Sequence, residues 1–340
     1  MGGEPGVCGF RKRLAYRLGL PGNQYLRTWY GGPIIPGLGR CVEAFSGDIV
    51  AAAAFPLLHM YTTLRACRRT NKPLVFIGAL HPLNDWGYNR PMIYQAIQQA
   101  DAYIAHTTFE RDHLVARGIR GESISVIGAG VDAHALAAAD GAAVRERYGW
   151  ENVPVVALVA KQTARKRFDV LLEAMRRVWA VRPDVRLLLA GARTPYSRQI
   201  EEMVDALPLE QRAHATLVSD FSEEEKPNLL AACDIFALPS GQESFGIAFV
   251  EAWACGKPVV GARIGAIPSV IDEGRDGLLV VYQDADDLAW AILELLADPS
   301  RRVRMGEAGR RKVLENYTWE IVTDQLRAVY TQVISAIANE

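Results

Sequence analysis

Short apolar runs of strand length alternate with helix-length segments along most of this chain. In its first part four such runs are predicted strands, and they cover residues 48–53, 73–79, 102–105 and 123–127. Strands that alternate with helices predict a parallel sheet, because a parallel connection needs a crossover long enough to hold a helix. This region is therefore expected to form a parallel α/β half-domain.

The second part shares this architecture without repeating the sequence. Its predicted strands cover residues 153–160, 185–190, 215–219, 235–238 and 259–261, and its predicted helices cover residues 247–255, 284–298, 300–316 and 317–334. Val259 and Val260 show no alternation with polar residues, which is typical of a parallel strand covered on both faces. One more helix and one more strand are expected between this strand and residue 281.

At 340 residues the chain is long enough for two domains of ordinary size. We place a first domain at residues 1–132, a linker at 133–152, a second domain at 153–318 and a closing helical segment at 319–340. Hydrophobic residues make up 50% of the chain and its net charge is −1, so composition indicates a soluble globular protein with no whole-protein attraction to nucleic acid.

Charge is distributed unevenly, since residues 1–75 carry ten basic and three acidic residues. Phe10, Leu14 and Leu18 stand four positions apart among basic residues and predict a short amphipathic helix. The basic region is either a face for an acidic acceptor or an anionic membrane, or a set of solvated arginines balanced by the second domain. Five scattered cysteines without metal-ligand spacing indicate free thiols in a reducing cytoplasm.

The candidate chemistry is concentrated in residues 234–281. Glu243 lies in a glycine-bearing loop after a predicted strand, and Glu251 lies eight positions later within the predicted helix, about 12 Å along its axis. That separation matches the span from a ribose to a sugar across a diphosphate. Unpartnered N–H groups at the helix start favour an anion, and Gly246 allows close approach. Two solvated surface glutamates are the alternative interpretation.

The segment ESFGIAFVEAWACGKPVVGARIGAIPSVIDEG, which starts at Glu243, resembles the Glu-x7-Glu signature of retaining glycosyltransferases of family 4. The resemblance extends over residues 48–335 and is most specific over residues 234–281. It implies the GT-B fold, in which two Rossmann-like parallel-sheet domains face a cleft. It also implies that Glu243 contacts hydroxyls of the donor sugar and that Glu251 holds the nucleotide ribose. The backbone amides expected to meet the sugar and diphosphate belong to Ser244, Phe245, Gly246 and Ile247.

The resemblance also assigns residues outside this segment. His81 follows the second predicted strand, where the family's histidine faces the donor sugar from the first domain. Lys161 and Lys166 stand where the family usually has Arg and Lys five residues apart, so they are expected to bind the diphosphate. Lysine lacks the planar fork of arginine, and Arg165 or Arg167 could take a share of the phosphate instead. Residues 218–222 correspond to the backbone that reads the base.

The implied activity is retaining transfer of a hexosyl group from a nucleotide-diphosphate sugar to a glycan, lipid-linked or small-molecule acceptor. We assign catalytic roles to Glu243, His81 and Lys166, because charge develops on the leaving diphosphate and beside the reacting sugar. No cofactor and no metal are expected, and a metal site built from His106, His113 and Glu110 is set aside. The alternatives are a nucleotide-sugar epimerase of GT-B fold and a non-catalytic nucleotide-sugar-binding protein. The expected location is cytoplasmic, with peripheral membrane contact through the basic region left open.

The first domain is expected to be truncated. Family 4 enzymes normally begin with a strand and a glycine-bearing loop, followed by further strand–helix units, before the segment that corresponds to residue 48. This chain has 47 residues there and no clear strand. The strand at 48–53 is therefore expected to have an unpaired edge, which residues 1–47 or a partner would have to cover.

Overall fold

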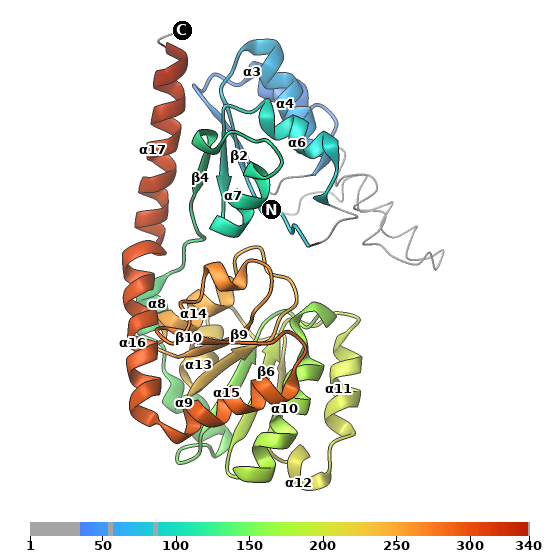
Figure 1. Ribbon diagram of the computed structural model, residues 1–340, viewed down its shortest axis with the longest axis vertical. Coiled ribbons are helices and arrows are strands. Elements are labelled where there is room, and N and C mark those ends of the chain that lie inside the picture. Colours follow the sequence, from blue (N-terminus) through green and yellow to red (C-terminus); the bar gives the residue numbers. More distant parts are fainter. Residues whose placement is uncertain (1–34, 54–56, 84–87, 339–340) are drawn as a thin grey trace, which may run out of the picture. The chain divides into compact units, whose positions relative to one another are not determined.

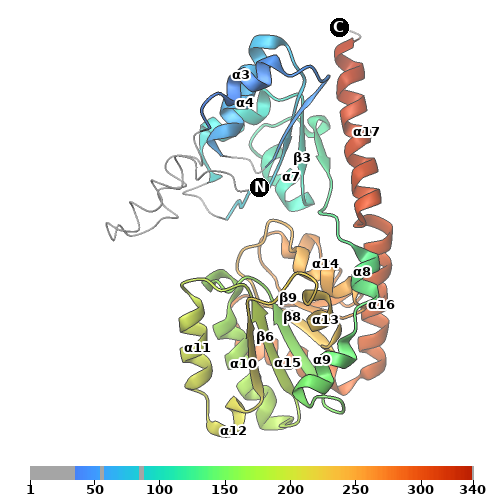
Figure 2. The ribbon, with the colours of Figure 1, turned by 180° about the vertical axis from the view of Figure 1, so that it is seen from behind.

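The structure, a computed structural model, describes residues 35–53, 57–83 and 88–338 (Figures 1 and 2). The chain divides into two compact units, which are described separately. Unit 1 comprises the residues up to Ile127 together with those from Asp324 onward, and unit 2 is Gly128–Thr323. Residues 133–152, expected as a linker, form helices α8 (Ala133–Ala137) and α9 (Gly141–Tyr148) of unit 2. Asp132 and Asp140 cap these helices, which explains why an alanine-rich stretch folds there.

Unit 1 contains a parallel sheet in the order β1-β2-β3-β4. The strands are β1 (Val50–Ala53), β2 (Leu74–Ile77), β3 (Ala102–Ala105) and β4 (Ile124–Val126), so all four strands predicted for this region are confirmed. The helices are α3 (Leu38–Ala44), α4 (Leu58–Thr70), α6 (Pro91–Gln98), α7 (Thr108–Val115) and, from Asp324 on, α17 (Trp319–Ala338). Met60, Phe76 and Tyr103 are fully buried in its core.

Strand β1 lies at the edge of this sheet. It pairs with β2, and within the ranges that the structure describes no strand pairs with its other side. The helix expected around Phe10–Leu18 lies outside the described residues, as do residues 1–34 of the segment expected to cover the edge. Residues 35–47 are described, and their helix α3 packs against α4. The expected truncation of the first domain therefore stays a prediction.

Unit 2 contains a six-stranded parallel sheet in the order β10-β9-β8-β5-β6-β7. Its strands are β5 (Val155–Val159), β6 (Arg186–Gly191), β7 (Ala215–Ser219), β8 (Ile235–Leu238), β9 (Val259–Ala262) and β10 (Gly277–Val280). The chain runs outward in one direction from β5 to β7 and in the other from β8 to β10. The order thus reverses between β5 and β8, and in open α/β sheets such a switch point is where ligands bind, at the carboxyl ends of the strands.

The remaining helices of unit 2 follow the expected strand–helix alternation. They are α10 (Phe168–Val181), α11 (Ser197–Asp205), α12 (Leu209–Arg212), α13 (Lys226–Ala231), α14 (Ile247–Ala254), α15 (Ala285–Ala297) and α16 (Pro299–Asn316). The helix expected between β9 and β10 is one turn of 3-10 helix, Ile267–Ser269. Gly265 and Gly274 both have positive φ and bracket this connection.

Helix α14 is held by close packing against α16. Gly309 has no room for a side chain, because a Cβ there would lie 2.0 Å from the ring of Trp253. A Cβ on Gly306 would lie equally close to the carbonyl oxygen of Gly256. The indole N–H of Trp253 donates to the carbonyl oxygen of Asp276 at 2.8 Å. The small residues of α16 thus fix the helix on which Glu251 stands.

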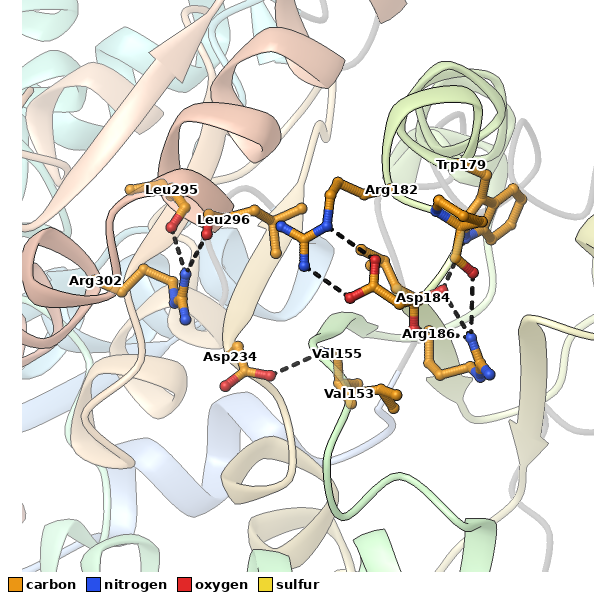
Figure 3. A network of polar contacts seen from close by, with 12 residues as sticks. Val153, Val155, Trp179, Arg182, Asp184, Arg186, Asp234, Leu295, Leu296 and Arg302 are labelled. Carbon is orange, nitrogen blue, oxygen red and sulfur yellow. Dashed lines mark hydrogen bonds and ion pairs between the residues drawn. The ribbon is translucent and has the colours of Figure 1, made fainter.

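Polar contacts at the opposite, amino-terminal end of the sheet are structural (Figure 3). Asp234 precedes β8, and its Oδ2 accepts the N–H of Val155 at the start of β5 at 2.8 Å. The same oxygen lies 2.6 Å from a guanidinium nitrogen of Arg145, which also bonds three carbonyl oxygens of neighbouring loops. This network joins α9 to the sheet and leaves the carboxyl ends of the strands for function.

Candidate functional site

Two loops at the switch point of unit 2 are joined through one carbonyl oxygen. The loop after β5 contains Arg165, whose carbonyl oxygen accepts the N–H of Gly241 at 2.9 Å and the hydroxyl of Ser240 at 3.1 Å. Gly241 and Ser240 belong to the loop after β8. Since β5 and β8 are neighbouring strands, these bonds connect the lysine-bearing loop to the loop that leads into α14.

Glu243 and Lys166 form an ion pair across these loops. Nζ of Lys166 lies 2.6 Å from Oε1 of Glu243, with side chains 16% and 11% exposed. A pair with so little contact with water interacts more strongly than one on an open surface. The positive charge expected to meet the diphosphate therefore has a carboxylate partner within the protein.

The other basic residues of this loop are placed differently. Lys161 and Arg165 are exposed. Arg167 has the left-handed backbone conformation, with φ of 57°, and its guanidinium donates to Asp169 at 2.7 Å and lies 5.9 Å from the ring centre of Tyr282. Arg167 is thus engaged in a local ion pair, whereas Lys161 is exposed to solvent.

Gly246 sets the direction in which α14 leaves the loop. Its φ of 91° is a conformation that favours glycine, and a Cβ there would lie 2.7 Å from the ring of Phe249. No side chain caps the helix start, and the N–H of Phe249 bonds the carbonyl oxygen of Gly246 at 2.9 Å, so the N–H groups of Ile247 and Ala248 are the ones left for an anion. Phe245 is buried against Tyr317 with 5.3 Å between the ring centres, while Ile247 is exposed. Ser244 is half-buried.

Glu251 stands on α14 and is paired with Lys226, a residue that the sequence analysis missed. Lys226 begins α13, and its Nζ donates to Oε1 of Glu251. The Glu251 side chain is 14% exposed, and burial raises its pKa, although Lys226 offsets part of that effect. The spacing of 25 residues gives no sequence signal for this pair, which exists because α13 and α14 pack together.

Near residues 218–222, hydrogen bonds and close packing join the segments at the carboxyl ends of β5, β6 and β7. Gln162 is fully buried, and its amide Nε2 donates to the hydroxyl of Ser219 at 3.0 Å. Asp220 has positive φ and accepts the N–H of Arg193 at 2.8 Å. A Cβ on Gly191 would lie 1.8 Å from the carbonyl oxygen of Ala160. The segment expected to read the base therefore has a defined backbone.

His81 lies in unit 1, in the loop after β2, with its ring edge-to-face against Tyr88 at 5.3 Å between centres. Every other expected site residue lies in unit 2, where the structure brings Glu243 together with Lys166. The side chains first weighed as metal ligands have other contacts. Glu110 binds backbone N–H groups near His81, and His113 lies 3.1 Å from the hydroxyl of Tyr94.

Within the ranges that the structure describes, no group of three or more His, Cys, Asp or Glu side chains is arranged to hold a metal ion. In the same part of the chain no helix combines the length and the apolarity needed to cross a membrane.

Two units with parallel sheets of four and six strands define a fold of the GT-B class. The family model described as "Glycosyltransferase Family 4" matches residues 6–135, and the model described as "Glycosyl transferases group 1" matches residues 142–312. The chain belongs to this family of group 1 and family 4 glycosyltransferases. The family and the fold class expected from the sequence are thereby confirmed.

Known proteins with similar sequences carry glycosyltransferase names. A GDP-mannose-dependent monoacylated alpha-(1-6)-phosphatidylinositol monomannoside mannosyltransferase of Corynebacterium glutamicum is 35% identical over 55% of this chain and 50% of its own length. The alpha-maltose-1-phosphate synthase of Mycolicibacterium smegmatis is 33% identical over 75% of this chain and 71% of its own length. The chain thus spans about half the length of the first relative and more of the second.

The solved structure of HepE from Anabaena in complex with UDP has a similar fold. It superimposes with a TM-score of 0.78 at 21% identity, covering 87% of this chain and 82% of HepE. At that identity the likeness concerns the fold alone.

Proposed function

We propose that this chain transfers a hexosyl group from a nucleotide-diphosphate sugar to a glycan, lipid-linked or small-molecule acceptor with retention at the anomeric carbon. The observation that supports this most is the Glu243–Lys166 pair beside the uncapped start of α14, at the switch point of the sheet. A carboxylate for sugar hydroxyls and positive charge for a diphosphate stand there side by side.

In this proposal the bond between the anomeric carbon and the diphosphate breaks, and negative charge develops on the leaving oxygens. Lys166, Lys161 and the first N–H groups of α14 stabilise that charge. The acceptor hydroxyl attacks from the face that the diphosphate leaves and gives its proton to a diphosphate oxygen. Glu243 and His81 position the sugar, so neither has to act as a nucleophile.

The remaining assignments follow from the same arrangement. Glu251 binds the ribose hydroxyls, and on donor binding its bond to Lys226 would be shared with the ribose. The backbone of Ser244, Phe245, Gly246 and Ile247 meets the sugar and diphosphate, and the reaction proceeds without a divalent metal. The cytoplasmic location and membrane contact through the basic region stay predictions.

The donor and acceptor classes are suggested by the relatives. One is named as dependent on GDP-mannose and acts on a phosphatidylinositol mannoside, and HepE was solved with UDP. A thermal-shift screen of UDP-, GDP- and ADP-sugars should raise the melting temperature with one base above the others, since a ligand stabilises the state that it binds. The preferred donor is then offered with inositol, phosphatidylinositol mannoside and oligosaccharide acceptors.

Product analysis with a labelled donor tests the activity. Labelled sugar on the acceptor with the anomeric configuration of the donor supports retaining transfer. Free nucleotide with an altered free sugar and no acceptor product indicates an epimerase, and a bound but unconsumed donor indicates a binding protein. Inverted anomeric configuration, or loss of activity in a chelator, contradicts the corresponding part of the proposal.

A further inference from the structure

A buried carboxylate in unit 1 lies outside the proposed donor site. Glu110 stands in the first turn of α7 and is 1% exposed. Its N–H bonds the hydroxyl of Thr107, the residue that caps this helix, at 3.2 Å. Burying a carboxylate costs free energy unless hydrogen-bond donors surround it. The groups that donate to Glu110 therefore indicate its structural role.

Three donors surround the Glu110 carboxylate. Oε1 accepts the N–H of Leu80 at 3.0 Å and the hydroxyl of Tyr103 at 2.7 Å, and Oε2 accepts the N–H of His106 at 2.9 Å. Gly78 leaves the space for this cluster, because a Cβ there would lie 2.3 Å from Oε1 and 2.4 Å from the Tyr103 hydroxyl. The carboxylate thus bonds the connections that follow β2 and β3.

The bond to Leu80 matters because Leu80 directly precedes His81. Strand β2 ends at Ile77, and the N–H of Gly78 makes a further bond of the sheet to the carbonyl oxygen of Ile104 at 2.7 Å. Beyond that point, the bond from Leu80 to Glu110 holds the chain at the edge of the sheet. The direction in which the backbone delivers His81 is therefore set by the Glu110 carboxylate.

We propose that Glu110 is a positioning residue for the transfer reaction, fixing the backbone that carries His81 so that the imidazole is in place before the donor arrives. The inference rests on the proposed role of His81. Glu110 acts through the loop and does not touch the substrate. A displacement of about 1 Å at a reacting group can cost up to about a hundredfold in rate, so a loosened loop should slow turnover.

Glu110→Gln tests this with little change in size. The amide can accept through one atom only, so its N–H side faces either the His106 N–H or the Leu80 N–H together with the Tyr103 hydroxyl. Either orientation loses a bond by which this side chain joins the connection after β2 to the connection after β3. We expect kcat to fall by about tenfold to a hundredfold, hydrogen exchange of the Leu80 amide to quicken, and nucleoside-diphosphate affinity, whose assigned residues lie in unit 2, to stay within about twofold of wild type. Tyr103→Phe removes one donor and keeps the carboxylate, so it should fold and lose less activity.

Asp112→Asn is the matched control, since Asp112 is an exposed carboxylate on the same helix and pairs with Arg111. It should leave both kcat and Leu80 exchange unchanged. The effects of Glu110→Gln and His81→Ala should be far from additive when combined, because the first is expected to act through the second.

Several outcomes would overturn the inference. Full turnover in Glu110→Gln beside a slow His81→Ala overturns the positioning role alone and leaves the proposed function intact. Wild-type turnover in His81→Ala removes the role of His81 and the inference with it. Losses that add fully in the double variant, or nucleotide affinity that falls as much as kcat, indicate a general structural role instead. Should Glu110→Gln fail to fold, unaltered kcat and Leu80 exchange in Tyr103→Phe would also count against the inference.

Discussion

The carboxylates at the carboxyl edges of the two sheets differ in what holds them. Glu110 in unit 1 is fully buried and bonds two backbone N–H groups and a tyrosine hydroxyl. Glu243 and Glu251 in unit 2 are slightly exposed and pair with the ends of lysine side chains. A backbone N–H leaves its acceptor only if the loop moves, whereas a lysine can turn to another anion by rotating its own bonds. The hydrogen bonds from backbone N–H groups suit a carboxylate that holds loops in place. The lysine pairs suit a site in which the lysine and the carboxylate each bind a different group when the ligand arrives.

This difference suggests how the free site is prepared for its donor. Lys166 pairs with Glu243 at 2.6 Å in a place with little contact with water. A diphosphate would draw the lysine away, while sugar hydroxyls take its place at the carboxylate.

Removing the buried carboxylate should destabilise unit 1. In Glu110→Ala three donors lose their acceptor, at about 1–3 kcal/mol each, so we expect the free energy of unfolding to fall by about 3 kcal/mol or more. Glu243→Ala should cost less than that, since it removes one ion-pair partner and the lysine left behind can turn toward water by rotating its own bonds. Urea unfolding, followed by amide exchange in each unit, measures both. Equal losses in the two variants would contradict the comparison.

Removing the lysine should mainly affect the reaction. Lys166→Ala should cost about 3 kcal/mol in kcat/KM, the usual scale for a group aimed at developing charge, and Lys161→Ala should cost a comparable amount. Arg176→Ala, which removes an exposed charge of α10 paired with Glu173, is the control. If both lysine variants stay active while a chelator abolishes activity, the metal-free assignment fails.

The two glutamates of unit 2 should divide binding from turnover. Glu251→Ala should weaken nucleoside-diphosphate binding by about 2 kcal/mol, because a ribose hydroxyl loses a charged partner. Glu243→Ala should lower kcat with little change in that affinity, since it is assigned to the reacting sugar. Calorimetric titration of each variant with the nucleoside diphosphate measures this affinity. Similar affinity losses in both variants would end the division of roles.

The smallest effect concerns pH. Burial raises the pKa of Glu110, and the hydrogen bonds from Tyr103, His106 and Leu80 only partly oppose this. Because the folded pKa lies above the unfolded one, the stability that Glu110 contributes is fully present below the unfolded pKa and is lost as pH rises through the folded pKa. Wild type should therefore lose stability relative to Glu110→Gln over that interval. If wild type instead gained stability relative to Glu110→Gln as pH rises, the sign of this prediction would be wrong.

Much of the fold could be predicted from the sequence, because buried parallel strands are continuous apolar runs. Residues 102–105 and 215–219 coincide with β3 and β7, and the predicted helix at 247–255 is one residue longer than α14. The helix expected after β9 is a single turn between two glycines, and the expected linker folds into capped helices.

The partners within the site could not be predicted. Glu243 and Glu251 stand out through their spacing, but Lys226 belongs to another helix and becomes a partner only when α13 and α14 pack. Glu110 was weighed as a metal ligand, although the pattern Thr107-x-x-Glu110 is typical of a helix start and was the available signal. Its bond to Leu80 spans 30 positions and depends on the neighbouring ends of β2 and β3.

The shared carbonyl of Arg165 has a consequence for protein engineering. Because Gly241 and Ser240 both bond that one oxygen, the loops after β5 and β8 form a matched set although some 75 residues separate them in the chain. A chimera whose crossover falls between the two loops would combine one parent's lysine loop with the other parent's glutamate loop. Recombination between relatives should therefore succeed more often when both loops come from the same parent, and insertions in one loop should be tolerated best with a compensating change in the other.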